Sequence, residues 1–134
     1  MKIFFDGGCR PNPGTMEVAA VARGRLHRRD AGTGTSTQAE WLALLHALDL
    51  AQALGERDVI LLGDATSVID QAVNGAKCRS PGPRACRDRF LLAIGNFDRV
   101  RVRHIKRNQN LAGIALEQLR QGRKVTSQGE EERR

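Results

Sequence analysis

The sequence contains few aromatic residues: they make up 4% of 134 residues, with one Trp and no Tyr. A core must therefore be built from Leu, Val, Ile and Ala, and the hydrophobic fraction of 40% is large enough for one. This composition argues against global disorder, and the length is typical of one domain. We expect a single domain over residues 1–122 and a charged, flexible tail over residues 123–134.

Long apolar segments are also missing. No apolar run approaches transmembrane length, and the apolar N-terminal stretch meets Asp6 too early for a signal peptide. The three cysteines, Cys9, Cys78 and Cys86, form no metal-ligand spacing and cannot all pair with one another. We therefore expect reduced thiols in a cytoplasmic, monomeric protein that does not bind a membrane.

Acidic residues are outnumbered, since 22 Lys and Arg against 15 Asp and Glu give a formal net charge of +7. Such a balance favours a polyanionic partner, with nucleic acid ahead of an anionic membrane surface. Arg greatly outnumbers Lys, and the guanidinium fork suits phosphate geometry. Charge alone does not separate a nucleic-acid-binding protein from a merely soluble basic one.

Hydrophobic patterns predict three strands in the first part of the chain. An apolar strand over residues 2–5 meets the turn-forming residues 6–14, which are rich in Gly and Pro. Loose alternation then predicts a strand over residues 17–23 and another over residues 25–28. The polar residues 32–37 offer N-caps for a following helix.

Helices and strands alternate in the rest of the chain. Apolar residues at three- and four-residue steps predict a helix over residues 38–54, and the apolar run 58–62 is typical of a strand covered on both faces. The other predicted elements are a helix over 67–73, a loop over 79–83, an amphipathic helix over 84–97 that buries Phe90, Leu91, Ile94 and Phe97, a basic-faced strand over 99–105 and a helix over 111–121. This order predicts an α/β fold with a mixed five-stranded sheet, three antiparallel strands and then two parallel ones, flanked by helices.

Three acidic residues stand at the ends of predicted elements. Asp6 and Asp64 each follow an apolar strand, and Glu40 lies in the first turn of the long helix. If the two strands are neighbours, these carboxylates meet where α/β sheets bind ligands. Carboxylates this close repel one another unless a cation lies between them, and hard oxygen ligands favour Mg²⁺. Each acid also has a structural alternative, as a turn residue (Asp6), an acid near a helix N-terminus (Glu40) or a helix cap (Asp64).

Four segments resemble, in order and spacing, those of type 1 ribonucleases H. They are the Asp-Gly and Asn-Pro-Gly of residues 6–14, the Thr-rich helix start of residues 35–44, the Gly-Asp of residues 63–69 and the Arg-Asn-Gln-Asn of residues 107–113. The resemblance covers about residues 1–120 and implies a ribonuclease H-like fold. It also implies an endoribonuclease that cleaves the RNA strand of RNA–DNA hybrids by two-metal-ion hydrolysis and leaves 5'-phosphates. The implied cofactor is Mg²⁺, two ions, with Mn²⁺ as a substitute.

The same resemblance assigns roles to single residues. Asp6, Glu40 and Asp64 become metal ligands, while the family's fourth acid, at the start of the last helix, is absent. Asn110 is our predicted fourth ligand and catalytic residue, and Gly113 is the alternative equivalent of the missing acid; Glu117 is expected to face solvent. The residues implied to bind nucleic acid are Gly7, Gly8, Cys9, Asn12, Ser36, Thr37, Thr66, Lys77, Arg79 and Arg107.

The departures from the family pattern keep a second hypothesis open. Without the fourth acid, the chain is alternatively a catalytically weak or inactive module that binds hybrids or double-stranded RNA on the same fold. The family's catalytic His also has no counterpart, because His27, His46 and His104 all fall within predicted strands or helices away from the acids. Trp41, next to Glu40, is interpreted as a core residue.

Overall fold

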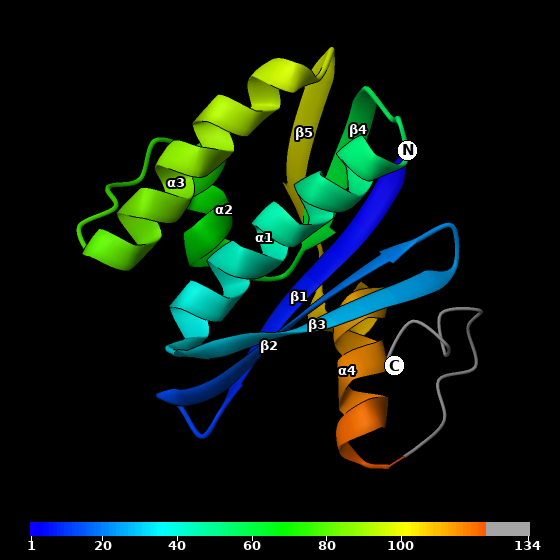
Figure 1. Cartoon of the computed structure of the whole chain (residues 1–134), viewed down its shortest axis with the longest axis vertical. Coiled ribbons are helices and arrows are strands. Elements are labelled where there is room, and N and C mark those ends of the chain that lie inside the picture. Colours follow the sequence, from blue (N-terminus) through cyan, green and yellow to red (C-terminus); the bar gives the residue numbers. More distant parts are fainter. Residues whose placement is uncertain (123–134) are drawn as a thin grey trace.

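The computed structural model describes residues 1–122, which form a five-stranded sheet with helices on both faces (Figure 1). The predicted tail over residues 123–134 lies outside the described residues. In chain order the elements are β1 (Lys2–Arg10), β2 (Gly14–Ala22), β3 (Arg25–Gly34), α1 (Ser36–Ala53), β4 (Asp58–Gly63), α2 (Thr66–Val73), α3 (Pro81–Ala93), the 3-10 turn η1 (Ile94–Asn96), β5 (Arg99–His104), the 3-10 turn η2 (Arg107–Gln109) and α4 (Leu111–Arg120).

The strand order is β3-β2-β1-β4-β5. The first three strands pair antiparallel, whereas β1 with β4 and β4 with β5 pair parallel. Helical segments link β3 to β4 and β4 to β5, as parallel pairing requires. The predicted mixed α/β sheet, three antiparallel strands followed by two parallel ones, is therefore confirmed.

Strand β1 is longer than its apolar residues indicate. We expected it to stop at Phe5 in a glycine-rich turn, but it continues to Arg10. Gly7 and Gly8 pair with Val18 and Glu17 of β2, so the ladder with a full-length partner outweighs the low strand propensity of glycine. For the same reason β3 extends to Gly34 rather than ending near residue 28.

Successive residues of β1 face opposite sides of the sheet. Ile3 and Phe5 belong to the main core, which includes the buried side of α1. On the other face, Ala19 and Val21 of β2 pack with the apolar residues of α4. Because Asp6 pairs with Ala19, the side chain of Asp6 shares the α4 face.

The helices begin and end close to the predicted positions, with two corrections. Helix α1 starts at Ser36 because the Thr35 hydroxyl caps it by accepting the Gln38 N–H, so Glu40 lies in its second turn rather than its first. Helix α3 starts at Pro81, inside the predicted loop, since Pro is favoured in a first turn. Phe90 and Phe97 are buried as expected, but Leu91 is 46% exposed, on the solvent side of α3.

The prediction that Trp41 is a core residue is confirmed. Trp41 is fully buried, edge-on to Phe90 with ring centroids 6.2 Å apart. The three cysteines are free thiols, of which Cys9 is partly exposed and the others buried.

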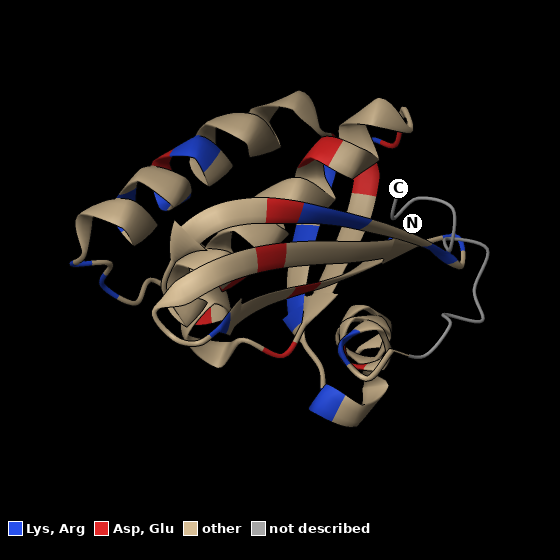
Figure 2. Cartoon of the chain, turned by 60° about the horizontal axis from the view of Figure 1, so that its bottom comes forward, with Lys and Arg blue, Asp and Glu red and all other residues tan. Residues whose placement is uncertain are grey.

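Within residues 1–122, no helix has the length and apolar character to cross a membrane. Basic and acidic positions are interspersed along the strands, and α4, seen along its axis, carries both (Figure 2).

Candidate metal centre on the α4 face of the sheet

The candidate site lies where strand β4 stops and β1 continues. Parallel pairing between these strands ends at Phe4 opposite Leu62, and β4 itself ends at Gly63. Asp6 therefore lies on the part of β1 whose β4 side is unpaired, and Asp64 follows the last residue of β4. The site is a notch in the sheet between two strands far apart in the sequence.

Gly7 allows α1 to approach this notch. A Cβ atom on Gly7 would collide with the backbone carbonyl of Ala39 in α1, so only glycine permits this spacing. The N–H of Gly7 donates a hydrogen bond to Oε1 of Glu40. The close packing of β1 against α1 thus fixes the third carboxylate beside the other two.

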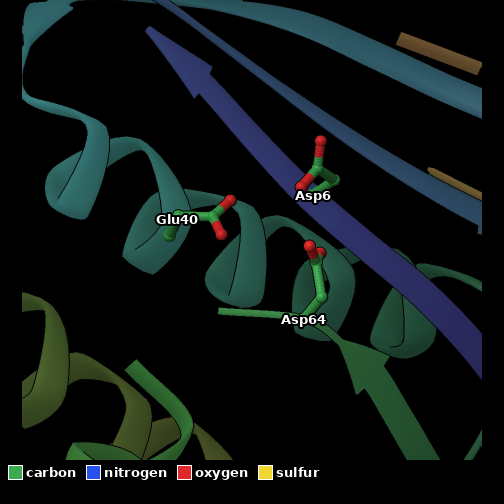
Figure 3. A group of neighbouring side chains, drawn as sticks. All are labelled: Asp6, Glu40 and Asp64. Carbon is green, nitrogen blue, oxygen red and sulfur yellow. The ribbon is translucent and has the colours of Figure 1, made fainter. Parts of the chain in front are cut away.

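The carboxylates of Asp6, Glu40 and Asp64 point toward one another from β1, α1 and the end of β4 (Figure 3). One ligand oxygen from each lies within 4.8 Å of the other two. Burial, followed by the charge of Asp64, raises the pKa of Asp6 to about 7. Burial, followed by the charge of Asp6, raises the pKa of Glu40 to about 8. Three half-buried carboxylates, two of which have raised pKa values, form a site suited to a hard divalent cation.

The structural alternatives for these acids do not hold. Asp6 lies inside a paired strand, not in a turn. Asp64 does not cap α2, whose N-cap is Ala65 and which has no side-chain cap. The Glu40 carboxylate accepts a hydrogen bond from the Gly7 N–H of β1, and not from a backbone N–H at the start of its own helix. Turn and capping roles therefore do not explain why the three acids lie together.

Comparisons with known proteins indicate the family of this chain. The model of the family described as "Reverse transcriptase-like" matches residues 5–118. A curated relative, "Ribonuclease HI" of Halobacterium salinarum, is 32% identical over 119 residues, which cover 84% of this chain and 60% of the relative. The chain belongs to the type 1 ribonuclease H family. It spans about 60% of the length of that curated relative.

Solved structures show the same fold. The crystal structure of RNase H1 from the halophilic archaeon Halobacterium salinarum NRC-1 has a TM-score of 0.77 and 31% identity, covering 87% of this chain and 96% of that one. The N-terminal RNase H domain of rv2228c from Mycobacterium tuberculosis also has a TM-score of 0.77, with 26% identity, covering 90% of this chain and 96% of the chain solved. LC11-RNase H1 in complex with RNA/DNA hybrid, at 22% identity and a TM-score of 0.74 over 82% and 88% of the two chains, shares the fold.

Asn110, the predicted fourth ligand of this ribonuclease H-like site, is fully buried beside Asp64. Its amide nitrogen donates to Asp64 Oδ1 at 2.8 Å and to the Phe5 carbonyl at 2.9 Å. Its amide oxygen accepts the Ala112 N–H at 3.2 Å and so caps α4. Both ends of the amide are engaged, and the nitrogen rather than the oxygen faces the acids. In this arrangement Asn110 orients Asp64 and anchors α4 to β1.

Gly113, the alternative equivalent of the missing acid, lies one turn into α4 and faces Asp6. A Cβ atom there would lie 3.5 Å from Asp6 Cγ and Oδ2, without a clash. Glu117, a turn later, lines a cavity of about 530 Å³ with Asp6, Asp64 and Gly113. We expected Glu117 to face solvent. Its side chain is 49% exposed, and the rest of it faces this cavity.

The residues implied to bind nucleic acid lie in two parts of the fold. Asn12, after β1, and Ser36, at the start of α1, are joined by two hydrogen bonds of 2.8 and 3.0 Å. Cys9 lies beside them, with its thiol 3.3 Å from the Gly34 carbonyl. Thr37, the next residue of α1, is exposed. These side chains surround the β1–β2 turn at one end of the notch.

The second group follows β4 and α2. Thr66 is exposed at the start of α2, and Arg107 is 92% exposed with its Nε 3.9 Å from Asp64 Oδ2. Lys77 and Arg79 are exposed in the segment between α2 and α3. That segment is tied to α1 through Gln71, which accepts from Trp41 Nε1 at 2.8 Å and donates to the Lys77 carbonyl at 3.3 Å. His46 Nε2 lies 3.0 Å from the His27 carbonyl, away from the acids. His104 is an exposed residue of β5, as expected, but it pairs with Gly63, the residue before Asp64.

Sequence reasoning missed the arginines of the α4 face. Arg10 and Arg120 line the same cavity as Asp6 and Asp64, and Arg120 lies directly against Gly8. Nothing in the residues around Arg120 distinguishes it from other basic residues of a helix C-terminus. Its position depends on the packing of α4 across the sheet, which the sequence pattern alone does not specify.

Proposed function

We propose that this protein is a metal-dependent endoribonuclease that hydrolyses the RNA strand of RNA–DNA hybrids and leaves 5'-phosphates. The observation that carries the proposal is the cluster of Asp6, Glu40 and Asp64, whose oxygens lie within 4.8 Å of one another. Membership of the type 1 ribonuclease H family supports the choice of reaction, and the relative named Ribonuclease HI supports the choice of substrate.

The donor set fits Mg²⁺, because its three carboxylates offer hard oxygen ligands and no thiolate or imidazole. We propose two ions, with Mn²⁺ able to replace Mg²⁺. Bound there, they would stabilise the attacking and leaving oxygens of an in-line phosphodiester hydrolysis. The chain itself orients two of the three acids: the Gly7 N–H holds Glu40, and the Asn110 amide holds Asp64.

The surroundings of the acids suit a nucleic-acid strand. Asn12 and Ser36 present polar groups at one end of the notch, next to the backbone of Gly7 to Cys9. Groups of this kind can recognise the 2'-hydroxyl that separates RNA from DNA. Lys77 and Arg79, in the segment tied to α1, would contact backbone phosphates and add affinity without sequence preference.

Cleavage assays test the proposal directly. A hybrid with a labelled RNA strand is incubated with the protein and Mg²⁺ or Mn²⁺, beside double-stranded RNA and double-stranded DNA of the same sequence. We expect cleavage of the hybrid RNA strand only. Asp64→Asn is the matched control, because it keeps an oxygen at Oδ1 to accept from Asn110 while removing the charge. Cleavage no faster than that of Asp64→Asn with both metals would rule out the enzyme.

A second candidate function is a binding module for hybrids or double-stranded RNA with weak or absent catalysis. The observation in its favour is the first turn of α4, which contains no acidic residue where the family carries its fourth acid. The same assay separates the two functions. Hybrid binding by the unmodified protein, with no cleavage above the Asp64→Asn level, would support the module.

A further inference from the structure

Arg120, the last residue of α4, lies against strand β1 with its Nη2 at Gly8. A Cβ atom on Gly8 would overlap Nη2 of Arg120, so the guanidinium occupies the space that any other side chain at this position would fill. Gly8 is two residues from Asp6 on the same face of β1. The absence of a side chain at Gly8 therefore allows a cation to lie next to the candidate metal centre.

The orientation of this guanidinium is set by Glu17. Arg120 Nε donates to Glu17 Oε1 at 3.0 Å, while Arg28 binds the other oxygen through Nε at 3.0 Å and Nη2 at 2.8 Å. Glu17 is thus held between two arginines, and all three side chains are largely buried. Glu17 accepts a hydrogen bond only from the Nε of Arg120. The two terminal nitrogens of Arg120 can therefore donate to a further anion.

Arg10 is the second arginine of this face. It follows Gly8 by two residues on β1, and its side chain is 66% exposed. Glu117 lies between the two arginines, with Oε2 at 3.4 Å from Arg10 Nη2 and 3.7 Å from Arg120 Nη1. Both separations are longer than a good charge-assisted hydrogen bond, so the two arginines hold Oε2 only weakly, while Oε1 accepts from Gln121 Nε2 at 3.1 Å. A negatively charged group thus already sits at the point where both guanidinium groups converge.

This convergence point opens into the cavity of the carboxylates. Arg10, Glu117 and Arg120 line the same cavity of about 530 Å³ as Asp6 and Asp64. A polymer that places one phosphodiester at the three acids extends its neighbouring phosphates along the walls of that cavity. Arginine forks are the side chains best matched to phosphate oxygens.

We propose that Arg10 and Arg120 form a binding subsite for a backbone phosphate of the substrate beside the cleaved one, and that Glu117 occupies this subsite in the free protein. The inference rests on the proposed function, because the phosphate belongs to the nucleic acid cleaved at the acids. On binding, the phosphate replaces the Glu117 carboxylate, and Glu17 keeps Arg120 in place. These residues bind and position the strand; they do not take part in the bond exchange.

The test measures binding, not cleavage, of a labelled hybrid by the full chain carrying Asp64→Asn, with chelator present and over a range of salt concentrations. The logarithm of the association constant falls with the logarithm of salt by about 0.9 for each phosphate contact on duplex DNA. We expect Arg10→Gln and Arg120→Gln each to reduce this slope by about one contact and to weaken binding roughly tenfold at low salt. Arg120→Lys should keep the slope and recover only part of the affinity, because the fork is lost.

Arg28→Gln is the matched control, since Arg28 pairs with Glu17 as Arg120 does but does not line the cavity of the acids. If Arg120 were only structural, Arg28→Gln and Arg120→Gln would lower Tm alike and neither would change the salt slope; that result overturns the proposal. Glu117→Gln, by removing the competing carboxylate, should tighten binding about threefold. Weaker or unchanged binding of Glu117→Gln would also count against the subsite.

Arg10→Gln keeps the test decisive if Arg120→Gln fails to fold, because Arg10 is largely exposed and its removal leaves the Glu17 network intact. An unchanged salt slope for Arg10→Gln would then reject the subsite. The proposed function fails separately: if the unmodified chain neither binds nor cleaves the hybrid, both proposals fall. If it cleaves the hybrid while the arginine variants bind as tightly as their parent, only the subsite falls.

Discussion

The amide nitrogen of Asn110 lies 2.8 Å from Oδ1 of Asp64, so the donor end of the amide, and not its oxygen, faces the candidate metal centre. The same nitrogen donates to the Phe5 carbonyl, next to Asp6, and the amide oxygen caps α4. One buried side chain thereby fixes the end of β4, strand β1 and the last helix relative to one another.

Asn110→Asp distinguishes an orienting amide from a metal ligand. The change removes the donor that faces Phe5 and Asp64 and brings a fourth charge against Asp64. Loss of buried hydrogen bonds predicts a decrease in the free energy of unfolding of about 2–4 kcal/mol in metal-free protein. We also expect no gain in Mg²⁺ affinity by calorimetry. Asn110→Ala should be similarly destabilised; tighter metal binding by Asn110→Asp would instead make position 110 a ligand.

Gly113→Asp restores a carboxylate where the fold has room for it. Its Cβ would lie 3.5 Å from the Asp6 carboxylate, so the new side chain can reach a cation held by Asp6. We predict roughly tenfold tighter Mg²⁺ or Mn²⁺ binding, with a faster cleavage rate. Gly113→Asn is the control of equal size without charge. Equal metal affinity for both variants would show that position 113 does not replace the missing acid.

The raised pKa values of Asp6 and Glu40 predict a pH-dependent stability in metal-free protein. Both groups bind protons more tightly when folded than their ordinary values near 4 allow, so their contribution to stability is present below pH about 4. It is lost as pH rises through about 7 for Asp6 and about 8 for Glu40. Thermal melts with chelator should therefore show Tm falling as the pH rises from about 4 to about 8.

Divalent cations should reverse this trend, because they favour the charged carboxylates. We expect Mg²⁺ to raise Tm more at pH 8.5 than at pH 5.5. Glu40→Gln, which keeps an oxygen to accept the Gly7 N–H, should flatten the pH dependence of the metal-free melts and reduce the response to Mg²⁺. If Mg²⁺ raised Tm equally at both pH values, the raised pKa values of Asp6 and Glu40 would be contradicted.

Gly7→Ala and Gly8→Ala should differ although the two residues are adjacent. A methyl group on Gly7 meets the backbone of α1, which cannot move without leaving the core, so we predict a loss of about 3 kcal/mol or more. A methyl group on Gly8 meets the end of the Arg120 side chain and no backbone atom, so only the Arg120–Glu17 pair must shift, and the loss should be smaller, about 1–2 kcal/mol. Chemical denaturation measures both. Equal losses would mean that α1 is not packed as tightly against β1 as the structure indicates.

Much of the fold was predictable because its hydrophobic patterns are strong. The continuous apolar run of β4 and the helical spacing of α1 lead to the mixed sheet, and Asp6, Glu40 and Asp64 follow from their places at the ends of predicted elements. The true length of β1 was not predictable, because Gly7 and Gly8 resemble turn residues until β2 is seen beside them. Propensity within a segment carries no information about a partner strand.

The arginines of the α4 face were missed for a related reason. Glu17 and Arg120 meet only because α4 crosses the sheet, and neither residue is unusual in its own segment. Asn110 was located correctly, but its role depends on which end of the amide faces Asp64. That orientation is set by the Ala112 N–H and the Phe5 carbonyl, which are backbone groups without a sequence signature.

Strand β1 carries the core on one face and the chemistry on the other, with Phe5 and Gly7 alternating with Asp6 and Gly8. Inserting or deleting one residue before Asp6 would exchange the two faces, burying a carboxylate under α1 and turning a phenyl ring toward the cavity. A one-residue slip of β1 would therefore disturb the core and the candidate site together. Changes that shift the register of β1 should consequently lower the native fraction and hybrid cleavage together.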